Sequence, residues 1–104
     1  MGKYVYTYRG GRMPETDAER EAVMAAWGAW LGGMGDAALD PGNPFGGSCT
    51  ISADGSVKDG GAAGIGGYSI VSADSLGAAT DMAKGCPILA DGGSVEVYEV
   101  HEMM

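Results

Sequence analysis

The chain has little positive charge. Six of its 104 residues are Lys or Arg against fourteen Asp or Glu, so the net charge is −8 and the isoelectric point lies near 4.2. Nucleic-acid binding needs a basic patch to contact phosphates, and anionic membrane surfaces likewise attract clustered basic side chains. We therefore expect neither nucleic acid nor a membrane as a partner.

Long apolar runs and metal-binding patterns are also missing. No apolar stretch reaches the length of a membrane span, and the opening "MGKYVYTYRGG" lacks the apolar core of a secretory signal, so we expect a cytoplasmic protein. Cys49 and Cys86 are then expected to be free thiols. They lack CxxC spacing and only one histidine accompanies them, which argues against zinc. No motif implies another metal, a nucleotide or an organic cofactor.

Glycine, by contrast, is abundant, with 20 residues and several adjacent pairs. Because glycine loses much conformational entropy on folding, such pairs mark turns between regular elements. A chain of this length is expected to form one domain over residues 1–104.

Hydrophobic periodicity predicts strands in several segments. In "KYVYTYR" (3–9), tyrosines occupy alternate positions, which is typical of a strand. The Asp54-Gly55 dipeptide predicts the turn of a short hairpin within 48–61. Further extended segments are expected within 36–45, 67–72 and 92–103.

Two other segments have the period of helices. In 13–34, Thr16 and Glu19 form a capping box, and apolar residues recur at intervals of four and three. This apolar stripe consists of Val23, Trp27, Trp30 and Met34. The second helix is expected within 72–87, with Ser72 as its N-cap.

The resulting order is β-α-β-β-α-β with a small extra hairpin inserted. This order is typical of the ferredoxin-like α+β fold, an antiparallel sheet with both helices on one face, because right-handed crossovers place them there. The opposite face would then have no cover from the chain itself, and an exposed apolar face indicates an interaction surface. The simplest cover is a second copy, so we expect a homodimer formed through the sheet face.

Several stretches of the chain are similar to those of a known family. They are "KYVYTY", the helical "MAAWGAW", and "DGG" followed by "GGYSIVSADSLGAATDMAKGCPILADGGSVEVYEV". With these stretches the chain resembles the YCII-related, or DGPF-domain, family over nearly its whole length, most specifically from Gly66 to Val100. The resemblance implies a dimeric α+β barrel, in which two ferredoxin-like sheets pack face to face.

The same resemblance raises the question of an enzyme. Some members resemble dehydrohalogenase-like or lyase-like enzymes that use a histidine–aspartate pair. Asp59 matches the aspartate of the DGPF motif, although glycines replace its Pro-Phe, and Trp27 stands where many members have a histidine. An acid–base pair would have to combine His101, the single histidine, with Asp59 or Asp40. The alternative for His101 is an exposed or interfacial side chain.

A ligand cleft is the other kind of site that the sequence suggests. Trp27 and Trp30 precede a glycine-rich helix end that lets the backbone approach closely. With Tyr68 they would wall an apolar cleft between helix and sheet, and Asp40, Asn43 and Asp59 would supply polar groups at its rim. Core packing of the tryptophans and ordinary turn formation by Asp40 and Asn43 are the alternatives.

Three functions therefore remain open. The chain could be a homodimer that binds a small hydrophobic or aromatic molecule, a lyase or isomerase with an acid–base pair, or a non-catalytic interaction or regulatory module. We favour the binding protein, because its aromatic and rim residues are present whereas the acid–base pair depends on a single histidine.

Overall fold

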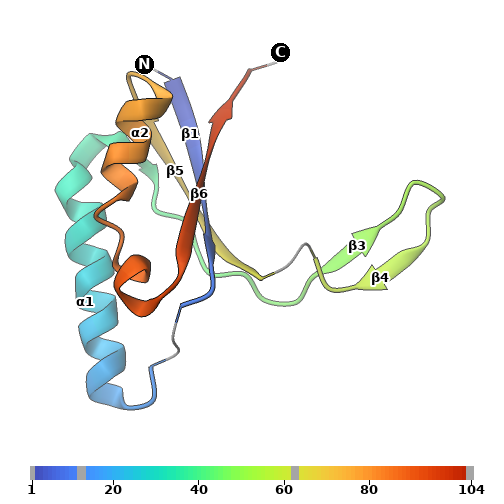
Figure 1. Ribbon diagram of the computed structural model, residues 1–104, viewed down its shortest axis with the longest axis horizontal. Coiled ribbons are helices and arrows are strands. Elements are labelled where there is room, and N and C mark those ends of the chain that lie inside the picture. The colour runs from blue at the N-terminus through green and yellow to red at the C-terminus, as the bar shows by residue number, and fades with distance from the viewer. Residues whose placement is uncertain (1, 12–13, 62–63, 103–104) are drawn as a thin grey trace.

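The main body is a four-stranded antiparallel sheet with two helices on one face (Figure 1). A computed structural model of the chain describes residues 2–11, 14–61 and 64–102. The sheet contains β1 (Gly2–Arg9), β2 (Ala38–Asp40), β5 (Ile65–Ala73) and β6 (Ser94–Val100) in the order β2-β5-β1-β6. Neighbouring strands are all antiparallel, so the predicted ferredoxin-like α+β class is confirmed.

Helix α1 (Asp17–Met34) begins and ends where its sequence predicts. The Thr16 hydroxyl accepts a hydrogen bond from the Glu19 backbone N–H at 3.1 Å, and the Glu19 carboxylate accepts one from a backbone N–H just before the helix at 2.8 Å. At the other end, Gly35 adopts a positive φ of 57°, which stops the helix. The Thr16 half of the predicted capping box is therefore confirmed, whereas the Glu19 carboxylate reaches the N–H of Glu15, one residue before the N-cap.

Helix α2 (Leu76–Ala83) begins later than predicted. Its N-cap is Ser75 and not Ser72: the Ser75 hydroxyl accepts a hydrogen bond from a backbone N–H of the first turn at 3.1 Å. Ser72 instead belongs to β5, where it pairs with Lys3 of β1. Strand pairing continues as far as Ala73, and this delays the turn into the helix.

The inserted hairpin, β3 (Cys49–Ile51) and β4 (Val57–Asp59), projects away from the main body (Figure 1). It turns at Asp54 and Gly55 as predicted: the Asp54 carboxylate accepts a backbone hydrogen bond at 2.8 Å, and Gly55 has a φ of 88°. The 3₁₀ turns are η1 (Gly35–Ala37) after α1 and η2 (Pro87–Asp91) after α2. The ends of two predicted segments, Met13 and Met103, lie outside the described residues.

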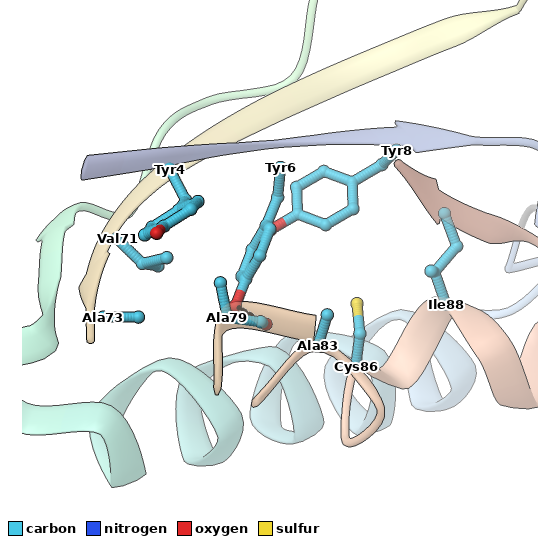
Figure 2. Close-up of a cluster of buried hydrophobic side chains, with 9 residues drawn as sticks. All are labelled: Tyr4, Tyr6, Tyr8, Val71, Ala73, Ala79, Ala83, Cys86 and Ile88. Carbon is cyan, nitrogen blue, oxygen red and sulfur yellow. Dashed lines mark hydrogen bonds between the residues drawn. The ribbon is translucent and has the colours of Figure 1, made fainter. Parts of the chain in front are cut away.

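The core lies between the sheet and the helices and is built on three tyrosines of β1 (Figure 2). Tyr4, Tyr6 and Tyr8 alternate along the strand and point toward the helices, as their period predicts. Small residues of α2, Ala79 and Ala83, let the Tyr6 hydroxyl approach and donate to the Ala79 carbonyl oxygen at 2.6 Å. The other buried members are Val71, Ala73, Cys86 and Ile88.

Tryptophans connect α1 to this core. Trp30 stacks on Tyr6 with ring centroids 5.9 Å apart, and its indole N–H donates to the Met82 carbonyl oxygen at 3.0 Å. Trp27 packs edge-on against Tyr8 at 4.8 Å. Trp27, Trp30 and Met34 of the predicted apolar stripe thus pack against the core, whereas Val23 borders a groove between α1 and η2, and every residue of α1 keeps some exposure. The helix therefore leaves room beside it.

The other face of the sheet has no helix over it in the described part of the chain (Figure 1). Val5 and Ile70 lie side by side on β1 and β5 and are half-buried. Tyr98, the partner of Val5 on β6, is 50 % exposed, and Leu39 of β2 is 52 % exposed. A row of apolar side chains is therefore open to solvent.

Alkaline pH is expected to unfold the protein through its buried core. Above pH 9 to 10 the unfolded chain loses the protons of Cys86 and Tyr6, whereas burial raises the pKa of these groups in the folded state to about 11 and about 12. Both groups are protonated in both states at neutral pH, so they make stability fall only as the pH rises through the unfolded-state pKa values, 9.0 for the cysteine and 10.0 for the tyrosine. The free energy of unfolding should fall by up to about 1.4 kcal/mol per pH unit for each group.

Urea unfolding followed by circular dichroism, from about pH 8 to about pH 11.5, measures this slope. Tyr6→Phe, which has no ionisable hydroxyl, should make the fall above pH 10 less steep, while Tyr8, whose pKa burial also raises, continues to contribute. An unchanged slope in that variant would contradict the role given to Tyr6.

Candidate ligand pocket

A pocket of about 390 Å³ opens between α1, the start of β5 and the loop that follows β2. Its volume falls within the range of small-molecule sites, roughly 300 to 1,000 Å³. The lining comes from separate parts of the chain: Tyr8 and Gly10, Trp27 and Leu31, Pro41 to Pro44, Gly66 to Ser69, and Ile88. The pocket is therefore a product of the tertiary fold.

Aromatic and aliphatic side chains form its inner wall. The Trp27 and Tyr8 rings meet edge to face, with centroids 4.8 Å apart and planes at 88°. Leu31 and Ile88 add aliphatic surface. Such a wall favours a flat apolar ligand, because aromatic rings bury large areas against each other in stacked or edge-on contacts.

The loop between Asp40 and Phe45 lies tightly against β5. The Asp40 carboxylate accepts a hydrogen bond from the Gly42 N–H at 2.8 Å, and the Phe45 N–H donates to the Gly66 carbonyl oxygen at 2.8 Å. Gly42 has a φ of 76°, and a Cβ at this position would collide with the Tyr68 carbonyl oxygen. Only glycine is compatible with position 42 of this loop.

Two buried hydroxyls join the inner wall to the loop. The Tyr8 hydroxyl donates to Ser69 Oγ at 2.7 Å, and Ser69 Oγ donates to the Pro41 carbonyl oxygen at 2.7 Å. Burial raises the pKa of Tyr8 far above its usual value. The wall of the pocket is therefore both fixed in position and uncharged at neutral pH.

Three of the predicted ligand-binding residues border this pocket, namely Trp27, Asn43 and Tyr68. The Trp27 ring belongs to the wall, and Asn43 lies exposed at the rim. Tyr68 borders the pocket, but the alternation of β5 directs Ser69 inward and the Tyr68 ring to the opposite face. There it stacks on Phe45, with centroids 5.6 Å apart.

Trp30 and Asp40 lie just outside the pocket. Trp30 donates its indole N–H to Met82 and borders a shallower groove between α1 and η2. The Asp40 carboxylate accepts the Gly42 N–H and, at 3.4 Å, the Tyr68 hydroxyl. The structure thus gives Asp40 the position of a support for the loop.

The structure does not bring the predicted acid–base residues together within one chain. His101 follows β6 with its side chain 76 % exposed, and its Nε2 lies 2.7 Å from Glu99 Oε1. Asp59 is exposed on the projecting hairpin. Asp40 lies on β2, at the opposite edge of the sheet from β6, the strand that His101 follows. Neighbouring strands are ~4.8 Å apart, so the three strand spacings between β2 and β6 amount to about 14 Å.

The cysteines and the other acidic groups form no further site in the part of the chain that the structure describes. Cys49 and Cys86 are free thiols, the first exposed and the second buried. No group of three or more His, Cys, Asp or Glu side chains among the described residues is arranged to hold a metal ion. Nor does any helix within the described ranges have the length and hydropathy to cross a membrane.

Several lining residues are not evident as site residues in the sequence, notably Tyr8, Leu31, Ser69 and Ile88. The sequence pattern does mark one of these residues, Ser69. Ser69 is a polar residue at a core-facing position of β5, two residues before the buried Val71. A hydroxyl at such a position needs a hydrogen-bond partner, and Tyr8 provides it.

The strand order, the helices on one face and the pocket beside α1 define a ferredoxin-like α+β protein with a cavity of small-molecule size. The chain belongs to the YCII-related domain family, whose model matches residues 5–104. This match confirms the resemblance drawn from the sequence. A search of curated proteins found none that matches the chain.

Proposed function

We propose that this protein is a homodimer that binds a small hydrophobic or aromatic molecule in the pocket beside α1. One observation carries the proposal: the pocket has an apolar, aromatic inner wall and the Asn43 amide at its rim. Small-molecule sites usually combine such a lining with a few polar groups that fix orientation. Trp27 and Asn43 are the candidate contact residues, with Tyr68, Asp40 and Trp30 supporting them.

The uncovered face of the sheet supports the homodimer. Val5, Ile70 and Tyr98 lie in one row across three strands, and the row is partly open to water. Packing this face on the same face of a second copy would remove apolar surface from water and give a face-to-face pair of sheets. An isologous contact of this kind needs one surface patch only.

The two alternative functions have less support. A lyase or isomerase would use His101 with Asp59 or Asp40, yet these residues lie apart within one chain and none of them lines the pocket. A pure interaction module would leave the pocket without a role.

Single-tryptophan variants test the binding site. Trp30→Phe leaves Trp27 on the pocket wall as the only tryptophan, and Trp27→Phe leaves Trp30, which lies outside the pocket. We expect an aromatic probe such as 2-naphthol to change the fluorescence of the Trp30→Phe variant saturably, and to change that of the matched Trp27→Phe variant several-fold less. Circular dichroism checks that both variants are folded. An equal response of the two variants, or no response in either, would argue against this pocket.

A further inference from the structure

We infer that the pocket selects uncharged ligands, namely planar aromatic molecules with a neutral polar substituent such as a hydroxyl or carbonyl group. The inference rests on the proposed function and adds the chemical class of the ligand. Its basis is the lining: among the described residues that border the pocket, none is Asp, Glu, Lys, Arg or His.

The charged residues nearest to the lining along the chain are directed elsewhere. Arg9 follows Tyr8, and its Nε lies 3.0 Å from Glu96 Oε1. Asp40 precedes Pro41, and its carboxylate accepts hydrogen bonds from a loop N–H and from a tyrosine hydroxyl. Neither residue is among those that line the pocket.

The ionisable group on the wall is also neutral. The Tyr8 hydroxyl is buried and donates its proton to Ser69 at 2.7 Å. Its oxygen retains lone pairs that can accept a hydrogen bond, but it offers no charge. The described lining therefore offers no charged group to pair with an anion or a cation.

A charged ligand would lose part of its hydration on entry and gain no opposite charge in return. Burial of an unpaired ion is strongly unfavourable for either sign. The net charge of −8 acts differently, since it repels anions and attracts cations over long distances. If the protein binds neither anionic nor cationic ligands, the cause is the uncharged lining. If it fails to bind anionic ligands only, the cause is the overall negative charge.

The rim provides one site for a neutral polar substituent. The Asn43 side chain is exposed beside the pocket and has no hydrogen-bond partner within the described residues. An amide presents both donors and an acceptor, so it can bind a hydroxyl or a carbonyl group. The aromatic part of the same ligand would lie against Trp27.

Two matched sets of probes test the inference by isothermal titration calorimetry. The two-ring set is 2-naphthol, 2-naphthoate and 2-naphthylmethylammonium, and the one-ring set is phenol, benzoate and benzylammonium. In whichever set has the ring size that the pocket accommodates, we expect the neutral probe to bind at least about tenfold more tightly than both charged probes. Binding of either charged member within about threefold of the neutral one would overturn the inference.

A charge placed at the rim gives a second test. Asn43→Lys should shift the preference toward the naphthoate, whereas the matched Asn43→Gln should keep the preference for 2-naphthol. Unchanged selectivity in Asn43→Lys would contradict selection by an uncharged lining. If charged and neutral probes bind equally and Trp27 responds to them, the proposed function stands and this inference alone fails. If no probe binds, both fail.

Discussion

Replacing Gly42 by alanine is expected to lower the free energy of unfolding by about 3 kcal/mol or more and to disrupt the pocket. The new Cβ would collide with the Tyr68 carbonyl oxygen and lie 2.6 Å from its carbonyl carbon, and the φ of 76° is strained for a residue with a side chain. The loop would have to move off β5. Pro41 would then lose the hydrogen bond that its carbonyl oxygen accepts from Ser69.

Gly55→Ala is the matched control. Gly55 has a φ of 88°, but a Cβ at this position of the exposed hairpin would meet open space, so only the backbone penalty of about 1 kcal/mol applies. Urea unfolding of both variants measures the difference, and ligand-dependent fluorescence of Trp27 reports on the pocket. Equal stabilities of the two variants would mean that the loop does not press on β5.

Replacing Tyr98 by aspartate is expected to separate the proposed dimer into monomers. Tyr98 pairs with Val5 in the apolar row of the open sheet face. In a face-to-face dimer the new carboxylate would be buried against apolar side chains, and by symmetry this happens on both copies. A penalty of about 3 kcal/mol or more weakens association by roughly a hundredfold or more.

Met24→Asp provides the control for added charge. Met24 is 68 % exposed on α1 and does not belong to the sheet face. Size-exclusion chromatography with light scattering over a dilution series measures the mass of both variants and of the unmodified chain. A Tyr98→Asp variant that stays dimeric would place the interface elsewhere. An unmodified chain that is monomeric throughout would refute the homodimer, but the pocket could still be tested by the single-tryptophan variants.

The elements of this fold follow largely from the sequence, because helices and strands depend on residues that are close along the chain. Alternating tyrosines identify β1, and the Thr16 and Glu19 pair marks the start of α1. The ferredoxin-like order then follows from the succession of elements. The sequence does not determine the start of α2, since Ser72 and Ser75 are both good N-caps. Pairing of β5 with β1, a contact between distant segments, decides between them.

The pocket is a different case, because its walls come from residues that are far apart in the chain. Trp27 and Asn43 are recognisable in the sequence as candidates for a cleft, but their meeting with Tyr8 and Ile88 requires the packing of α1, β1 and η2. The sheet face on which Tyr68 lies depends on which alternate residues of β5 point toward the core.

The sequence by itself determined the family, the fold class and the aromatic character of this protein. It also supplied candidates for an acid–base pair: His101 and Asp40 by the chemistry of their side chains, and Asp59 by its match to the DGPF motif. Only the tertiary structure decided that these groups lie apart within one chain and that uncharged side chains line the pocket. The physical reason is that local periodicity specifies elements, whereas a site depends on the distances that long-range packing sets between them.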